Sequence, residues 1–117
     1  MKKLLTGAAT LAVLAALALP ALAAPTAQTV RVTERDYAIT LSARPKAGPV
    51  AFVIRNAGED GHDFWLRGGG RTFKSRLVGR GASARLTATL KKGVRYQFWC
   101  GVGSHANKGM RGSFVVR

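Results

Sequence analysis

The chain has 117 residues, room for one small domain, and 19 lysine and arginine residues against five acidic ones give it a formal net charge of +14. Such a charge favours acidic partners or anionic surfaces. Its single cysteine excludes an intramolecular disulfide. The basic residues are dispersed along the chain, many of them singly at strand positions, instead of forming one run. Together with the export signal described next, this argues against nucleic acid as a partner.

The N-terminus has the three parts of a secretory signal peptide. A positively charged head (Met1–Lys3) precedes an Ala/Leu-rich stretch over residues 4–19, and the small-residue pattern Ala21-Leu22-Ala23 follows. We predict that residues 1–23 are a signal peptide removed after Ala23. An uncleaved anchor is the alternative, but the apolar stretch is short for a hydrocarbon core of ~30 Å. The mature protein is then expected in the periplasm or outside the cell, without stable membrane insertion.

After a short lead-in over residues 24–28, residues 29–117 form one domain of short predicted strands separated by glycine-rich turns. The strand-like runs are residues 29–33, 37–41, 50–54, 83–90, 94–98 and 114–116. Alternation is clearest in 83–90, where Leu86, Ala88 and Leu90 share one face. Residues 72–78 have the composition of a single helical turn. We expect an all-β protein, a Greek-key β-sandwich of seven or eight strands.

Three side chains with metal-binding potential lie close together near the C-terminus. Cys100, His105 and Met110 occupy a glycine-rich stretch just before the last predicted strand. A soft thiolate, an imidazole and a weak axial thioether suit copper. The fourth candidate is His62, the only other histidine. An unpaired thiol in an exported chain needs a use other than a disulfide, although a lone cysteine is also a common inert core residue.

Strand periodicity brings two of these candidates together. If Phe98 faces the core, Cys100 faces the same way two residues later. His62, Phe64 and Leu66 form a second inward face, with Trp65 on the opposite side. We therefore expect His62 and Cys100 to meet at one end of the sandwich interior. The alternative is a secreted β-sandwich without a metal.

The pattern Cys-x4-His-x4-Met at Cys100, His105 and Met110, with Asn-x5-His at Asn56 and His62, resembles the cupredoxins, the family of plastocyanin and azurin. The resemblance implies a copper ion bound by His62, Cys100, His105 and Met110, with the His105 ring edge exposed as the electron port. It also implies that the backbone N–H groups of Asp63 and Val102 donate hydrogen bonds to the cysteine sulfur. One position departs from the family, because the residue after the upstream histidine is often Asn. Asp63 has no amide to donate to the ligand loop.

The resemblance further implies an exported type 1 (blue) copper protein that carries one electron at a time between redox partners, and not an enzyme. We expect a monomer whose partners have acidic docking surfaces, with Lys108 and Arg111 at the rim of its own docking patch. A periplasmic copper carrier or chaperone is the alternative. Such carriers usually have a Met/His-rich exposed segment, and this chain has two Met residues, one of them the initiator. A copper oxidase or reductase needs further metal ligands, which two histidines do not supply.

Overall fold

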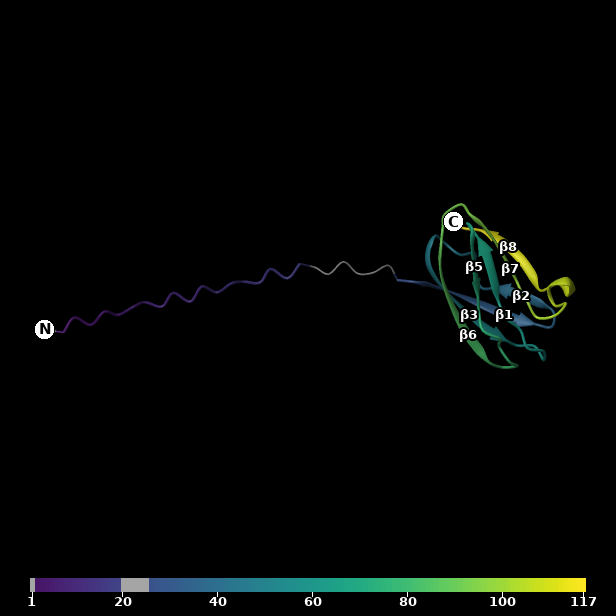
Figure 1. Ribbon diagram of the computed structural model, residues 1–117, viewed down its shortest axis with the longest axis horizontal. Helices are drawn as coiled ribbons and strands as arrows, with labels where there is room; N and C mark the ends of the chain where they lie inside the picture. The colour runs from purple at the N-terminus through teal and green to yellow at the C-terminus, as the bar shows by residue number, and fades with distance from the viewer. Residues whose placement is uncertain (1, 20–25) are drawn as a thin grey trace.

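A computed structural model describes residues 2–19 and 26–117 (Figure 1). The predicted cleavage pattern at residues 21–23 lies outside the described residues. Residues 2–19 adopt neither helix nor strand and are exposed. Within the two described ranges we find no helix with the length and apolarity that a membrane crossing requires.

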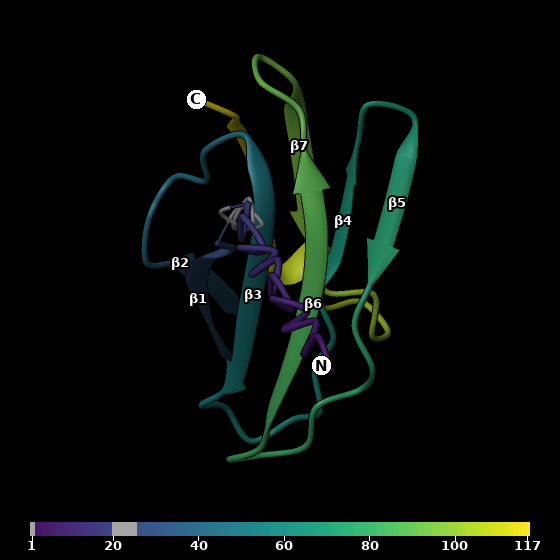
Figure 2. The same cartoon turned by 90° about the vertical axis from the view of Figure 1, so that its left-hand side faces the viewer.

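The domain consists of eight strands and one short 3-10 helix. These are β1 (Gln28–Arg35), β2 (Ala38–Leu41), β3 (Gly48–Asn56), β4 (Trp65–Gly68), β5 (Arg71–Lys74), β6 (Ser83–Leu90), β7 (Arg95–Trp99), η1 (Ala106–Lys108) and β8 (Arg111–Val115). They form two four-stranded sheets with the orders β2-β1-β3-β6 and β5-β4-β7-β8 (Figure 2). β1 and β3 pair in parallel, and the other pairs in these two sheets are antiparallel. The predicted all-β sandwich is confirmed.

The single helical turn expected over residues 72–78 is wrong. Arg71–Lys74 form β5, which pairs with β4 in an antiparallel hairpin. The two-residue connection is Gly69-Gly70, with φ of 57° and 75°. Positive φ at both positions is what a tight hairpin turn requires, and glycine adopts it without steric cost. The hairpin turn thus sets the structure of the following residues.

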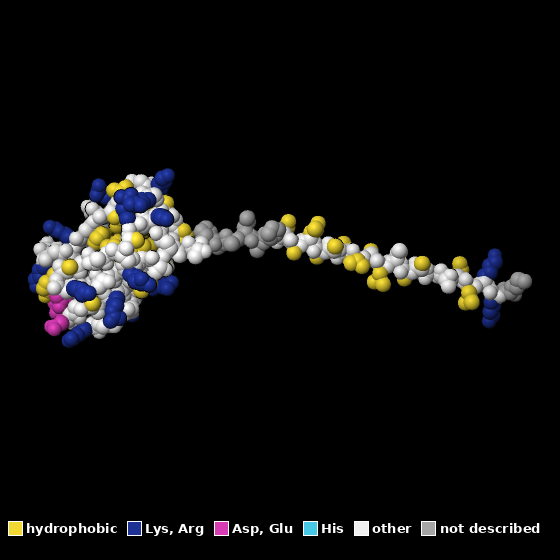
Figure 3. Space-filling model, turned by 180° about the vertical axis from the view of Figure 1, so that it is seen from behind, with side chains coloured by type: hydrophobic (Ala, Val, Ile, Leu, Met, Phe, Trp, Pro, Cys, Tyr) yellow, Lys and Arg dark blue, Asp and Glu magenta, His cyan; other side chains and the backbone are white. Residues whose placement is uncertain are grey.

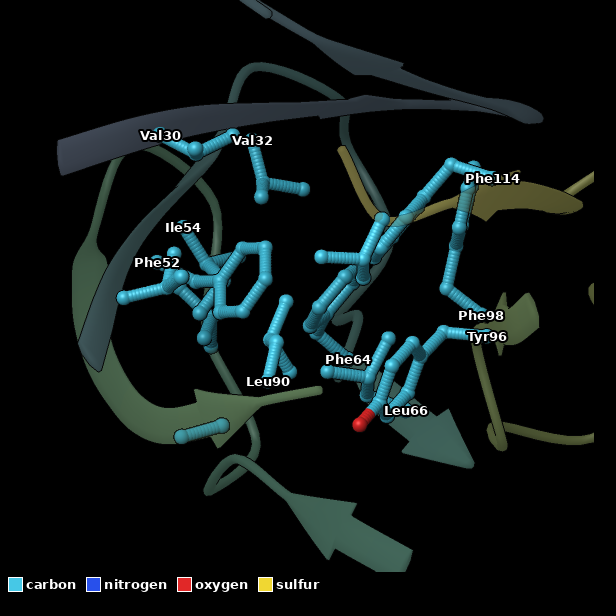
Figure 4. Packing of buried hydrophobic residues seen from close by; sticks show 14 residues of the cluster. Val30, Val32, Phe52, Ile54, Phe64, Leu66, Leu90, Tyr96, Phe98 and Phe114 are labelled. Atoms are coloured by element: carbon cyan, nitrogen blue, oxygen red, sulfur yellow. The ribbon is translucent and has the colours of Figure 1, made fainter. Parts of the chain in front are cut away.

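The core lies between the inward faces of the two sheets. Figure 4 shows the buried side chains Val30, Val32, Phe52, Ile54, Phe64, Leu66, Leu90, Tyr96, Phe98 and Phe114. Aromatic rings continue the packing across one sheet, since the ring centroids of Phe64 and Phe98 are 5.8 Å apart and those of Phe98 and Phe114 are 6.2 Å apart. Offset contacts at such distances stabilise aromatic pairs.

Two inward faces continue beyond the apolar core to polar residues at one end of the sandwich. On β1, Val30 and Val32 are followed by buried Glu34, and on the β7 side Phe98 is followed by buried Cys100. In Figure 1, β1 runs from the N-terminal segment toward the end of the domain where η1 lies. The period-two alternation of the strands therefore brings chemically active side chains to this end.

Candidate metal centre

The loop after β3 carries His62 and is held in place by Asn56. The Asn56 amide donates to the carbonyl oxygens of Asp60 and Val78 over 2.7 and 2.9 Å, and its Oδ1 accepts from Gly58 N–H over 2.8 Å. His62 exchanges two backbone hydrogen bonds with Val78, of 3.1 and 2.7 Å. These contacts hold the His62 side chain inside the sandwich, where it is fully buried.

The other candidate ligands lie between β7 and β8 in a closed, hydrogen-bonded loop. Cys100 N–H donates to the Met110 carbonyl over 3.0 Å, and Met110 N–H donates to the His105 carbonyl over 3.2 Å. Gly109, with φ of 124°, turns the chain between η1 and Met110. Cys100 and Met110 are both fully buried. The backbone thus keeps Met110 beside both Cys100 and His105.

The structure brings the thiol and both imidazoles to one point. Cys100 Sγ lies 3.8 Å from His62 Nδ1 and 3.7 Å from His105 Nδ1, and the two Nδ1 atoms are 3.2 Å apart. One ion bound to all three requires such separations when metal–nitrogen and metal–sulfur bonds are ~2.0 and ~2.3 Å. Within the described residues, the ligand atoms of His62, Cys100 and His105 lie close enough together to bind one metal ion. The donor set fits a single copper ion.

Burial and neighbouring backbone groups have opposite effects on the Cys100 thiol. Burial raises the pKa of the Cys100 thiol, and hydrogen bonds from the N–H groups of Asp63 and Val102 act against this by lowering it. The two sulfur contacts expected from the sequence stay a prediction, which this effect of the Asp63 and Val102 N–H groups on the thiol supports. A metal ion that binds the Cys100 sulfur as a thiolate releases the proton of the thiol.

The Asp63 side chain connects the segment that carries His62 to the loop that begins at Cys100. Its Oδ1 accepts a hydrogen bond from the backbone N–H of Gly101 over 2.6 Å, and its Oδ2 accepts one from Trp65 Nε1 over 3.1 Å. Gly101 has no room for a side chain, because a Cβ there would lie 2.4 Å from Trp65 Nε1. The carboxylate therefore still joins the two ligand-bearing loops, as an acceptor.

Two carboxylates that the sequence did not point to lie behind the histidines. Asp36 Oδ1 is 2.6 Å from His62 Nε2, and Asp60 Oδ2 is 3.5 Å from His105 Nε2. The Tyr37 hydroxyl donates to Asp60 Oδ2 over 2.8 Å. The chain has only five acidic residues, but nothing in the local sequence connects Asp36 or Asp60 to a particular histidine. Each imidazole therefore turns Nδ1 toward the sulfur and Nε2 toward a carboxylate.

The expectation that the His105 ring edge is the electron port stays a prediction, although only a small part of the side chain reaches the surface. Its side chain is 11% exposed, and the Tyr37 ring packs against it with centroids 4.9 Å apart. Lys108 Nζ lies 4.4 Å from the centroid of the Tyr37 ring. Tyr37 is half-buried, so its ring packs against His105 and is itself partly exposed to solvent.

Charge is distributed unevenly over the domain. Figure 3 shows lysine and arginine side chains scattered over the visible face and acidic side chains confined to the end remote from the N-terminal segment. Asp36, Asp60 and Asp63 contact the candidate centre directly or through its loops. The end that holds the centre is thus the acidic part of a strongly basic domain.

Several solved structures have a fold similar to that of this chain. Auracyanin A, described as a "blue" copper protein from the green thermophilic photosynthetic bacterium Chloroflexus aurantiacus, superimposes with a TM-score of 0.67 at 17% identity, covering 79% of this chain and 100% of that chain. Auracyanin B gives 0.67 at 18% identity, covering 82% and 93%. Dithionite-reduced auracyanin from Roseiflexus castenholzii gives 0.65 at 16% identity, covering 80% and 99%.

No family model matches the chain, and no curated protein matches it significantly. The similar structures define its fold, which is that of the cupredoxins.

Proposed function

We propose that His62, Cys100, His105 and Met110 bind one copper ion and that the protein is an exported, monomeric one-electron carrier of the blue-copper type. The observation that carries this proposal is the convergence of one thiol and two imidazole nitrogens, all within 4.8 Å of one another and all from buried residues. Thiolate and imidazole are ligands that copper accepts in both of its common oxidation states. The similarity in fold to auracyanins supports the same reading.

The ion would supply the Cu(I)/Cu(II) couple. The protein would hold the ligands in fixed positions and exclude water from them. Backbone hydrogen bonds between Cys100 and Met110 and between Met110 and His105 hold three ligands in one loop. Burial of His62, Cys100 and Met110 keeps water away from the centre. The N–H groups that donate to the sulfur stabilise its negative charge and so influence the potential.

Electron exchange is proposed to take place at the end of the domain that carries Tyr37 and His105. The Tyr37 ring contacts the His105 ring and is itself half-buried. It therefore offers electrons a route from the proposed copper site to a partner surface. Redox partners with acidic docking surfaces would be attracted by the charge of the whole domain. That charge is +12 once Lys2 and Lys3 leave with residues 1–23, when 17 basic and five acidic residues remain.

The test is addition of Cu(II) to the purified metal-free protein while the visible spectrum is recorded. We expect one equivalent of copper to give an intense colour that a reductant bleaches, because thiolate-to-Cu(II) charge transfer requires a copper–sulfur bond. Cys100→Ala should remain folded and lose the colour. A colourless one-to-one copper complex of the native protein would refute the proposal.

A further inference from the structure

One of the shortest polar contacts at the candidate centre joins a carboxylate to a histidine. Asp36 Oδ1 lies 2.6 Å from His62 Nε2, the nitrogen that points away from the cysteine sulfur. The Asp36 side chain is 23% exposed and the His62 side chain is fully buried. A hydrogen bond between an ionised and a neutral group is stronger in such a partly dry environment than in water.

Neighbouring backbone N–H groups and the space at Gly58 fix the position of the Asp36 carboxylate. Its Oδ2 accepts a hydrogen bond from Glu59 N–H over 2.8 Å, and Asp60 N–H contacts the carboxylate oxygens at 3.3 and 3.4 Å. Gly58 leaves the space that the group needs, since a Cβ at this position would lie 2.4 Å from Asp36 Oδ1. These N–H groups hold the carboxylate beside His62.

We propose that Asp36 is a positioning residue for the proposed copper site: it keeps the proton of His62 on Nε2 and increases electron donation from Nδ1 to the metal. The inference rests on the proposed function. A histidine whose remote N–H donates to a carboxylate has its tautomer and ring orientation fixed and is a more basic ligand. Stronger donation stabilises Cu(II) more than Cu(I), so Asp36 lowers the reduction potential.

Asp60 makes a similar but weaker contact with His105. Its Oδ2 is 3.5 Å from His105 Nε2, longer than a hydrogen bond, and the same oxygen accepts the Tyr37 hydroxyl over 2.8 Å. Its side chain is also 47% exposed, so solvent screens its charge. Asp36 is consequently the dominant of the two carboxylates, and the histidines are unequal ligands.

The competing explanation is that Asp36 only braces the loop of residues 58–60. If Asp36 acted only in this way, its removal would lower the stability of the metal-free protein. The reduction potential and the tautomer of His62 would stay unchanged. Three variants separate the explanations. Asp36→Asn removes the charge and keeps an oxygen acceptor. Gly58→Ala keeps the charge and displaces the carboxylate. Glu59→Gln removes an equal charge from the same loop at an exposed side chain.

The first measurement uses the metal-free protein and needs no copper. Nitrogen-15 NMR of the imidazole rings should show His62 protonated on Nε2 in the wild type, with that preference reduced in Gly58→Ala. A wild-type His62 that carries its proton on Nδ1 would overturn the inference, whatever the protein does with copper.

The second measurement is a redox titration with Cu(II) and Cu(I) competition assays. Loss of a partner behind a metal-bound histidine weakens metal binding roughly 10- to 100-fold, and a tenfold change in the Cu(II)-to-Cu(I) affinity ratio is about 59 mV for a one-electron couple. We expect Asp36→Asn and Gly58→Ala to raise the potential by about this amount or more, and Glu59→Gln to change it far less.

A potential unchanged in Asp36→Asn, or raised as much by Glu59→Gln, would overturn the inference. A wild-type protein that forms no coloured copper complex would instead refute the proposed function. The NMR result on the metal-free protein would then stand by itself as evidence on the Asp36–His62 contact.

Discussion

The backbone N–H of Gly101 donates a 2.6 Å hydrogen bond to Oδ1 of Asp63, and this contact joins the loop that begins at Cys100 to the strand that follows His62. Asp63 also accepts from the Trp65 indole. The carboxylate thus connects the segments that carry two of the proposed copper ligands, His62 and Cys100.

Asp63→Ala should destabilise the metal-free protein, because two donors lose a charged acceptor. Hydrogen bonds to charged groups contribute about 1.5–3 kcal/mol each, and Asp63 is half-buried, so we expect a loss of about 2 kcal/mol in the free energy of unfolding. Urea denaturation of both proteins measures it. Asp63→Asn, which keeps one acceptor oxygen, should lose less, and an equal loss in the two variants would contradict this account.

Glu34 should make stability depend on pH. It is fully buried, and among the described residues neither carboxyl oxygen has a hydrogen-bond partner. Burial first, and then the charge of Asp63, raise its pKa from 4.5 to about 8. The unfolded chain therefore loses this proton at lower pH than the folded protein does. The contribution is fully present below pH 4.5 and is lost as pH rises to about 8, at up to ~1.4 kcal/mol per pH unit.

The measurement is urea denaturation of the metal-free wild type and Glu34→Gln at several pH values between 5 and 8. We expect the wild type to lose stability across this range and the variant to have a flatter profile, because glutamine does not ionise. Parallel profiles for the two proteins would show that Glu34 does not carry the dependence.

Met110→Leu should keep copper and colour but raise the reduction potential. The thiolate and two imidazoles are the stronger donors, while an axial thioether is a weak ligand that tunes the potential. Its loss removes donation that favours Cu(II). Redox titration measures the shift, and a Cu(I) chelator competition assay accompanies it. An unchanged potential with a large loss of Cu(I) affinity would favour a copper carrier over an electron carrier.

Electron exchange with an acidic redox protein should slow as salt increases. The Debye length falls from ~30 Å at 0.01 M to ~10 Å at 0.1 M ionic strength, which screens the attraction due to the high net charge. Lys108→Glu should reproduce part of the loss, since Lys108 lies over Tyr37 beside the proposed exit. Stopped-flow rates at several salt concentrations test this. Rates independent of salt would rule out charge steering.

Much of the fold and the candidate centre could be read from local patterns. Alternation in residues 83–90 predicted β6 with its bounds, and the two-residue steps from Phe98 to Cys100 and from His62 to Phe64 predicted which side chains are buried. Such predictions succeed because the direction of a strand side chain depends on its neighbours along the chain. The spacing of Cys100, His105 and Met110 is equally local.

The sequence by itself determined the alternating strands, the set of possible ligands and the charge of this protein. Only the tertiary structure decided which carboxylate lies behind each histidine and that the Tyr37 ring packs against His105. Asp36 and His62 are 26 residues apart, and they meet because β1 and β3 pair in parallel, so the segments after both strands leave the sheet at the same end. Contacts between loops depend on which distant strands pair, whereas alternation along one strand indicates only the face that each side chain occupies.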